Sequence, residues 1–165
     1  MDIRGSCHCG AVQFAAHTHT PHPYMWCYCS ICRKTAGGGG YAINIMADAD
    51  TLRVDGMQHV SPYQACISDP DDPASTTLSP AVRHFCSVCG SALWIADPRW
   101  PEWIYPFASA IDTALPVPPE HTRIMLEFAA PWCEIPQNPN DKHFAGYPDV
   151  AIIDWHKQHG LYEES

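Results

Sequence analysis

Seven of the nine cysteines in this 165-residue sequence fall into three short clusters, and no other feature constrains the fold as strongly. Cys7 and Cys9 are two positions apart, as are Cys27 and Cys29, and such close neighbours rarely reach disulfide geometry. The odd cysteine count also argues against a complete disulfide framework. The pattern therefore favours metal ligation, with disulfides between clusters or a redox role as the alternative. The clusters are Cys7/Cys9, Cys27/Cys29/Cys32 and Cys86/Cys89.

The first and last clusters together supply four thiolates. Side chains two apart on an extended strand share a face, so the thiols of Cys7 and Cys9 can converge on one ion. Cys86 and Cys89 have the Cys-x-x-Cys-Gly spacing, which brings two thiolates together over a tight turn. Zinc in a structural site takes four such ligands in a tetrahedron. We therefore expect these four cysteines to close a structural zinc site that joins the N-terminal strand to a later hairpin.

The middle cluster differs because Cys27, Cys29 and Cys32 supply only three ligands. Three protein ligands and one open position form the arrangement of a reactive zinc site, so we expect two zinc ions per chain. Other interpretations fit the same spacing. Cys66, Cys133 or a nearby histidine would close a second structural centre, and iron–sulfur ligation shares the Cys-x-x-Cys pattern. The seven cysteines can also be divided differently between two metals.

The rest of the sequence predicts a mainly β domain. Its 46% apolar content excludes wholesale disorder, and its 16 prolines and 10 glycines favour turns and short elements. A helix is predicted only at 148–160, where Pro148 suits a first turn and Gly160 a stop. An acidic, proline-rich surface loop is predicted at 68–75. The length and the absence of a repeat favour a single domain over residues 1–165. Strands are predicted at 10–15, 24–29, 41–46, 51–54, 82–85, 91–95, 103–108 and 123–128.

The charge and the N-terminal segment limit the expected partners. A formal net charge of −9 disfavours nonspecific attraction to nucleic acid or to an anionic membrane. No stretch approaches the roughly 20 apolar residues of a membrane-spanning helix. Residues 1–7 contain no apolar signal-peptide core, so we expect the protein to act in the reducing cytoplasm. Nothing in the sequence indicates an oligomeric state.

Three motifs carry the clusters in order: GSCHCGAV at 5–12, CYCSICRK at 27–34 and FCSVCGS at 85–91. They resemble the glutathione-dependent formaldehyde-activating enzyme family, which also includes centromere protein V. The likeness extends past Pro131 and Trp132 to Asp154-Trp155-His156, although the loop around 68–80 is longer than is usual in that family. The resemblance implies an Mss4-like fold of twisted antiparallel sheets held by zinc, with a short C-terminal helix.

The resemblance also implies roles for the cysteines. Cys7, Cys9, Cys86 and Cys89 would hold a structural zinc. The second zinc, at which the substrate thiol acts, would be held by Cys27, Cys29 and Cys32.

The ligand type narrows the chemistry of the second site. Zinc with three thiolates is a weaker Lewis acid than zinc with three imidazoles, so activation of water is disfavoured. A sulfur ligand is natural there, because the metal favours thiolate and lowers the pKa of a thiol. We therefore expect a carbon–sulfur lyase or glutathione-adduct enzyme that acts on S-hydroxymethylglutathione or a related thiol adduct. The alternative is a noncatalytic, zinc-stabilised binding module, since fold does not imply function.

An anionic substrate such as glutathione needs local positive charge. Arg33 and Lys34 follow the third ligand directly, and Gly37 and Gly38 would let backbone amides approach the ligand. We take these four residues as candidate substrate contacts. The competing interpretations are a solvated pair of cations and a flexible turn.

Other chemistry-bearing residues are predicted to be structural. The proline-interrupted tract with His17, His19 and His22 is expected to be exposed and not to bind metal. Cys66 and Cys133 are expected to be buried thiols, Trp132 and Trp155 core residues, and His156 and His159 residues of a helix surface.

Overall fold

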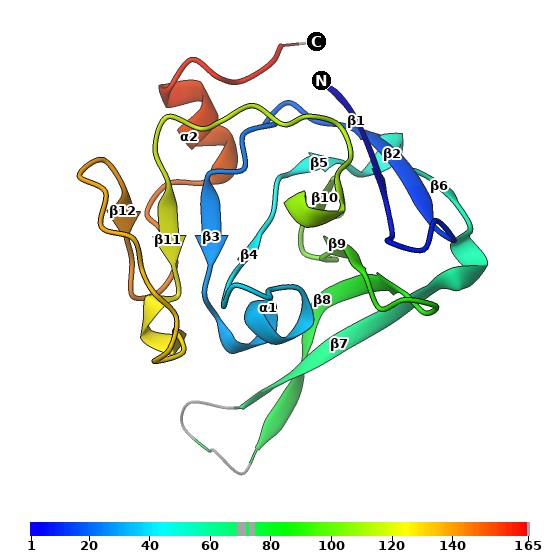
Figure 1. Cartoon of the computed structure of the whole chain (residues 1–165), viewed down its shortest axis with the longest axis horizontal. Helices are drawn as coiled ribbons and strands as arrows, with labels where there is room; N and C mark the ends of the chain where they lie inside the picture. Colours follow the sequence, from blue (N-terminus) through cyan, green and yellow to red (C-terminus); the bar gives the residue numbers. More distant parts are fainter. Residues whose placement is uncertain (69–71, 73–74, 165) are drawn as a thin grey trace.

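The computed structural model describes residues 1–68, 72 and 75–164, and its arrangement is shown in Figure 1. The predicted acidic loop at 68–75 therefore lies largely outside the described residues. Strands dominate the described chain, as the composition and the family resemblance predict. No helix among the described residues is long and apolar enough to cross a membrane.

The first sheet has three antiparallel strands in the order β1-β2-β6. Residues alternate between buried and exposed along β1 and β2, so that Ile3 and Phe14 point into the core. The turn between β1 and β2 carries the first cysteine pair, and β1 pairs with β2 from Asp2↔His17 to Ser6↔Gln13. The strands are β1 (Asp2–Ser6), β2 (Gln13–His17) and β6 (Arg53–Asp55).

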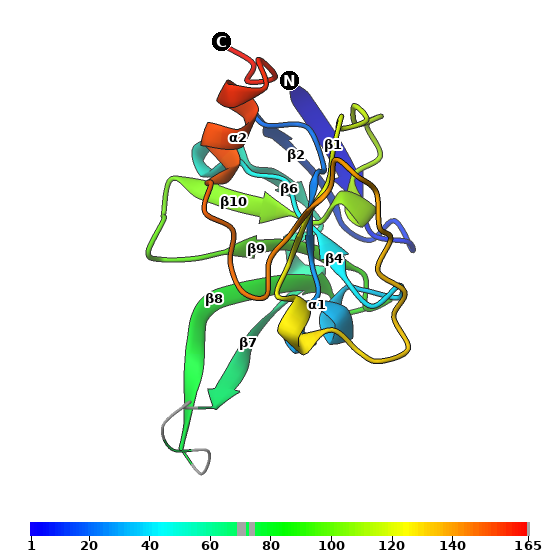
Figure 2. The same ribbon diagram turned by 90° about the vertical axis from the view of Figure 1, so that its left-hand side faces the viewer.

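The second sheet has five antiparallel strands in the order β5-β10-β9-β8-β7. Its two longest strands, β7 and β8, form a hairpin that projects from the body of the molecule (Figures 1 and 2). The last cysteine pair begins at the end of β8 and occupies the turn into β9. The strands are β5 (Ala47–Asp48), β7 (Val60–Ser68), β8 (Thr76–Cys86), β9 (Ala92–Ala96) and β10 (Trp103–Pro106).

The third sheet contains both parallel and antiparallel pairs, whereas the family resemblance predicts antiparallel sheets. Its order is β12-β11-β3-β4, with β11 parallel to both β3 and β12, while β3 and β4 are antiparallel. Parallel pairing is possible here because β3 and β11 are joined through most of the chain and not by a hairpin. The strands are β3 (Met25–Cys27), β4 (Ala42–Ile43), β11 (Thr122–Ile124) and β12 (Lys142–His143).

The described residues form two α-helices, of which only the C-terminal one was expected. That helix, α2 (Ile152–Gln158), is shorter than the predicted 148–160. The unexpected helix, α1 (Ser30–Thr35), follows β3 and carries a cysteine of the middle cluster. The predicted strand at 123–128 ends at Ile124, because Met125 has a φ of 60° and begins a 3₁₀ turn. The 3₁₀ turns are Ala49–Thr51, Met57–His59, Ala108–Ala110 and Leu126–Phe128.

Aromatic packing holds the core and the C-terminal helix. Phe14 meets Trp94 edge-on between the first two sheets, with ring centroids 5.7 Å apart. The helix α2 docks through Trp155, which stacks on Tyr24 at 3.7 Å and is buried as expected. His156 is also fully buried, which corrects its expected place on the helix surface: its ring packs against Tyr24 and His22.

Candidate metal centres

The four-cysteine centre consists of Cys7, Cys9, Cys86 and Cys89, whose sulfur atoms all lie within 4.8 Å of one another. Two similar turns bring them together. The Gly10 N–H donates to the Cys7 carbonyl at 3.0 Å, and the Gly90 N–H donates to the Cys86 carbonyl at 2.8 Å. Both glycines have a φ of +76°, a left-handed conformation that side chains disfavour. The centre thus joins the β1–β2 turn to the β8–β9 turn.

Neighbouring donors stabilise the thiolate form of two of the four cysteines, Cys7 and Cys89. Burial opposes ionisation of Cys7, but the Val12 N–H, 3.2 Å from its sulfur, and the thiols of Cys9 and Cys86 outweigh it and lower its pKa. The side chain and backbone of Ser91 lower the pKa of Cys89 to about 5. By contrast, despite a backbone hydrogen bond that lowers it, the pKa of Cys9 is raised to about 12 by burial and the neighbouring thiols. Four converging soft donors, of which Cys7 and Cys89 are biased toward thiolate, fit a closed zinc site.

The three-cysteine centre consists of Cys27, Cys29 and Cys32, whose sulfurs also lie within 4.8 Å of one another. Local structure fixes each of them. Cys27 is the last residue of β3, Cys29 is the N-cap of α1, and Cys32 lies in the first turn of that helix. The Cys29 sulfur accepts a hydrogen bond from the Cys32 N–H at 3.3 Å, as a serine or aspartate would at this position. The N-cap and first turn of this short helix thus direct the thiols of Cys29 and Cys32 toward one point.

Three thiols this close cannot all ionise without a cation. Hydrogen bonds from the Cys27 and Cys32 thiols lower the pKa of Cys29, while the Cys29 and Cys32 sulfurs and burial raise the pKa of Cys27. A divalent ion removes this conflict, because it favours the thiolate form of all three. The donor set is soft, half-buried and without a fourth member among the described residues, which fits zinc bound through three protein ligands.

Arg83 is a neighbour of this centre that sequence reasoning missed. It lies within β8, is only 9% exposed, and places its Nη2 atom 4.0 Å from the Cys32 sulfur. The only available signal was a cation three residues before Cys86, between Val82 and His84 of the predicted strand. Tyr147, which is largely exposed, was missed as well: partial desolvation and the nearby charges of the three cysteines raise the pKa of its hydroxyl.

The wall beside the centre is aromatic and held by an ion pair. Trp26 stacks on Tyr41 with ring centroids 4.4 Å apart, and the Arg123 guanidinium lies 4.4 Å above the Trp26 ring. Arg123 donates to Tyr28 Oη at 3.0 Å and to Asp141 Oδ2 at 2.8 Å. Arg123 is almost fully buried, so its contacts orient Trp26 and Tyr28, the residues on either side of Cys27.

The candidate substrate contacts lie at a cavity of about 770 Å³. Arg33, Lys34, Gly37 and Gly38 all line it, together with Cys7 of the four-cysteine centre. Among the described residues, none of the three-cysteine centre is part of its lining. The structure thus gathers the four residues at one hollow, on the side of α1 that faces the four-cysteine centre.

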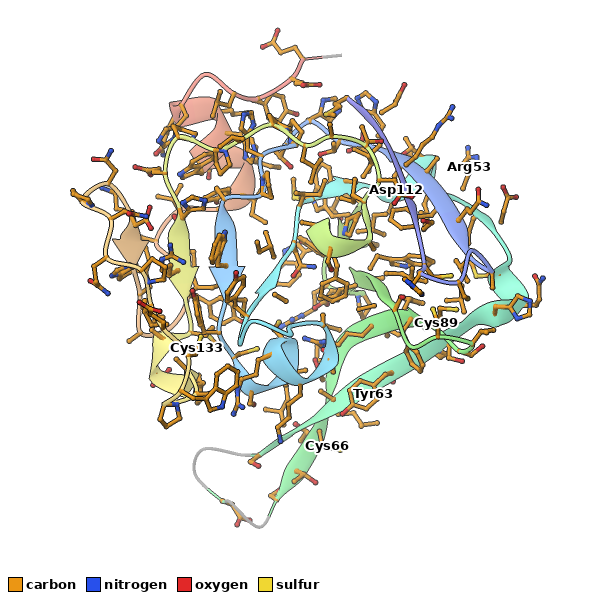
Figure 3. The ribbon with its side chains drawn as sticks, in the orientation of Figure 1. Arg53, Tyr63, Cys66, Cys89, Asp112 and Cys133 are labelled. Atoms are coloured by element: carbon orange, nitrogen blue, oxygen red, sulfur yellow. The ribbon has the colours of Figure 1, made fainter. Side chains whose placement is uncertain are left out.

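Several predicted structural roles need correction. Cys66 is exposed on the projecting hairpin, and Cys133 is half-buried, with its thiol donating to the Gly39 carbonyl at 3.3 Å (Figure 3). Trp132 is 67% exposed and therefore not a core residue, because the segment that carries it packs over the surface near Gly40.

The histidine tract also differs from its expected exposure. His17, His19 and His22 are half-buried; His17 pairs with Asp2 and His19 with Asp48. They belong to neither of the metal-binding groups found among the described residues. His159 lies on the surface as expected and pairs with Glu120.

Comparison with known proteins supplies the family. The sequence profile described as "Glutathione-dependent formaldehyde-activating enzyme" matches residues 2–125. A Halomonas elongata protein named as a candidate glutathione-dependent formaldehyde-activating enzyme is 56% identical over 163 residues, which is 99% of each chain. A crystal structure of a Rhodobacter sphaeroides protein superposes with a TM-score of 0.51 at 26% identity, covering 68% of this chain and 91% of that one. The chain therefore belongs to the glutathione-dependent formaldehyde-activating enzyme family.

Proposed function

We propose that this protein is a zinc-dependent carbon–sulfur lyase or glutathione-adduct enzyme of the cytoplasm, with two zinc ions per chain. The observation that carries the proposal is the three-cysteine centre, where three sulfurs converge within 4.8 Å without a fourth ligand among the described residues. Family membership and the name of the Halomonas elongata relative point to the same substrates, glutathione and formaldehyde.

The reaction needs no oxidant or reductant. The thiol sulfur of glutathione forms a bond to the carbonyl carbon of formaldehyde, and the carbonyl oxygen takes up the proton that the thiol gives up. The product is S-hydroxymethylglutathione, and the reverse reaction breaks the same carbon–sulfur bond. When bound, zinc would supply a position that favours thiolate and lowers the pKa of the substrate thiol.

The chain's own residues have distinct tasks in this proposal. Cys27, Cys29 and Cys32 form the metal-binding set, and the capping bond from the Cys32 N–H fixes the Cys29 sulfur. Arg33 and Lys34 supply cations at the 770 Å³ cavity for the carboxylates of glutathione, with the backbone of Gly37 and Gly38 beside them. The four-cysteine centre stabilises the fold without taking part in the chemistry.

The test has two readouts on the full chain. Exchange between formaldehyde and S-hydroxymethylglutathione, followed by NMR, should be faster with the zinc-loaded protein than without it. Cys29→Ser, which keeps a side chain that can cap α1, should abolish the acceleration and bind one zinc instead of two. Cys66→Ser, at an exposed thiol on the projecting hairpin, is the matched control and should change neither quantity.

The second readout separates an enzyme from a noncatalytic binding module. In cobalt-substituted protein, glutathione should alter the visible absorption, whereas S-methylglutathione, which has no free thiol, should not. An unchanged spectrum with glutathione, together with exchange no faster than in buffer, would overturn the proposed function and favour the binding module.

A further inference from the structure

Arg83 is an unusual residue to find inside this sheet. It lies between β7 and β9, opposite Tyr63 on one side and Ile95 on the other, and its side chain is almost completely withdrawn from water. A guanidinium keeps its charge under all ordinary conditions, and burying that charge is costly unless an anion lies nearby.

No carboxylate of the described chain supplies that anion. Among the described residues, Arg83 forms no ion pair, although Arg99 and Arg123 pair with Asp97 and Asp141. Its Nε and Nη1 atoms are buried and have no hydrogen-bond partner among the described residues. Within the part of the chain that the structure describes, the head group has one polar contact, the Cys32 sulfur 4.0 Å from Nη2.

The charge at the three-cysteine centre explains this position. Three thiolates around a divalent ion leave about one negative charge, and an incoming thiolate would raise it to about two. Such a build-up in a half-buried site is unfavourable unless a fixed cation offsets it. Arg83 is that cation: it is buried, cannot lose its proton, and approaches one of the three ligands directly.

We propose that Arg83 is the counter-charge that lets the three-cysteine centre hold its metal and accept an anionic thiolate as fourth ligand. This inference rests on the proposed function, and it makes Arg83 a positioning residue that selects thiolates over neutral ligands.

The test compares Arg83→Met, Arg83→Lys and Arg53→Met with the unaltered chain. Methionine fills the buried space without a charge, and lysine restores the charge without the planar head group. Arg53, exposed at the opposite corner of the molecule from Cys133, loses the same charge far from the centre and is the matched control (Figure 3). The thermal unfolding temperature, and the zinc content of the four-cysteine centre (the first zinc), check that each variant folds.

Two quantities are measured on the cobalt- and zinc-loaded proteins. In cobalt absorption titrations, Arg83→Met should bind glutathione about tenfold more weakly than the unaltered chain, with little change for neutral imidazole. Arg83→Lys should recover part of the affinity. Without any thiol, Arg83→Met should release the second zinc to a chelator faster than Arg53→Met, while the first zinc is retained in both.

The outcomes separate this inference from the proposed function. If Arg83→Met binds glutathione and retains zinc as the unaltered chain does, the role of Arg83 is overturned while the enzyme proposal stands. If the unaltered chain shows no response to thiols but Arg83→Met still loses the second zinc, the enzyme proposal fails and the charge compensation remains. If Arg83→Met loses imidazole and glutathione binding equally, the role of Arg83 is purely structural, and its proposed selectivity for thiolates over neutral ligands is overturned.

Discussion

The ligands of the four-cysteine centre differ sharply in their surroundings. Cys7 and Cys86 are buried, while Cys9 and Cys89 are exposed. The buried pair therefore belongs to the hydrophobic core as well as to the metal site, and its loss affects both. The exposed pair would contribute to stability mainly through a bound metal.

Replacement of Cys86 by alanine should remove the metal from the four-cysteine centre and lower the free energy of unfolding by several kcal/mol. Structural zinc contributes on the order of 10 kcal/mol in small domains, which is comparable to the net stability of a whole domain. Zinc analysis and thermal unfolding measure the two effects. Cys66→Ala, at an exposed position on β7, should retain both zinc ions and stay within about 0.5 kcal/mol of the unaltered chain. Full zinc content in Cys86→Ala would contradict this assignment.

His156 makes stability depend on pH in a defined direction. Burial lowers the pKa of its imidazole to about 4. Its Nε2 accepts from the His22 N–H at 3.2 Å, so Nδ1 carries the proton and donates to the Ile152 carbonyl at 2.8 Å. The folded state therefore holds a neutral ring, and protonation would remove the acceptor for His22.

The unfolded chain binds a proton at His156 near pH 6.5, while the folded chain does so only near pH 4. The stabilisation is therefore fully present above about pH 6.5 and is lost as the pH falls toward 4, with a slope of about 1.4 kcal/mol per pH unit. His156→Gln, which keeps a donor and an acceptor but does not titrate, should remove this component. Urea unfolding of both proteins between pH 7.5 and 4.5 measures it, and the difference between them cancels the contribution of the cysteines. Parallel curves for the two proteins would contradict the assignment.

At the scale of elements, the loop after α1 contains two adjacent glycines, of which one has no room for a side chain and the other has ample room. A Cβ on Gly37 would lie 2.1 Å from the Tyr41 carbonyl oxygen, whereas a Cβ on Gly38 would have no atom within 4 Å. Gly37→Ala should therefore displace the backbone of Tyr41, which stacks on Trp26 beside the three-cysteine centre, and cost about 1–3 kcal/mol.

Gly38→Ala is the matched control for this steric effect and should change the free energy of unfolding by less than about 0.5 kcal/mol. Urea unfolding of the two variants compares them directly. Equal stability would mean that the loop adapts freely and does not fix the wall beside the centre.

The sequence predicted elements whose signal is local. Residues 91–95 and 103–108 show short apolar runs between turns, and β9 and β10 form there. The strand β7 carried no such signal, because Ala65 is its only fully buried residue and Pro62 lies within it; it is a strand because β8 pairs with it. The helix α1 is six residues long, too short for a hydrophobic period, and depends on the cap at Cys29.

The metal-binding groups were more accessible to sequence reasoning than their surroundings. Cysteine spacing predicted that the three clusters bind metal but left their division between two ions open, and the family likeness supplied the two groups. The role of Arg83 could not be predicted, because Arg83 and Cys32 are 51 positions apart in the sequence and only the packing of α1 on β8 brings them together. The parallel pairing of β11 with β3 is non-local in the same way.

At the scale of the whole molecule, the two centres should lose their metals in sequence. Four thiolates hold an ion more firmly than three, and only the four-cysteine centre joins two sheets. A chelator should first remove one zinc with little change in far-UV circular dichroism, and then remove the second together with cooperative unfolding. Simultaneous loss of both ions with the circular dichroism signal would contradict the separate roles.

The distance along the chain between the two halves of the four-cysteine centre has a consequence during synthesis. Cys9 and Cys86 are 77 positions apart, whereas Cys27, Cys29 and Cys32 leave the ribosome almost together. At roughly 5–20 residues per second, the nascent chain exposes the first pair about 4–15 s before its partners exist. During that interval the three-cysteine segment is the most complete zinc ligand on the growing polypeptide. Under the proposed function, metal delivered cotranslationally would therefore reach the three-cysteine centre first, and the ion of the four-cysteine centre would arrive last.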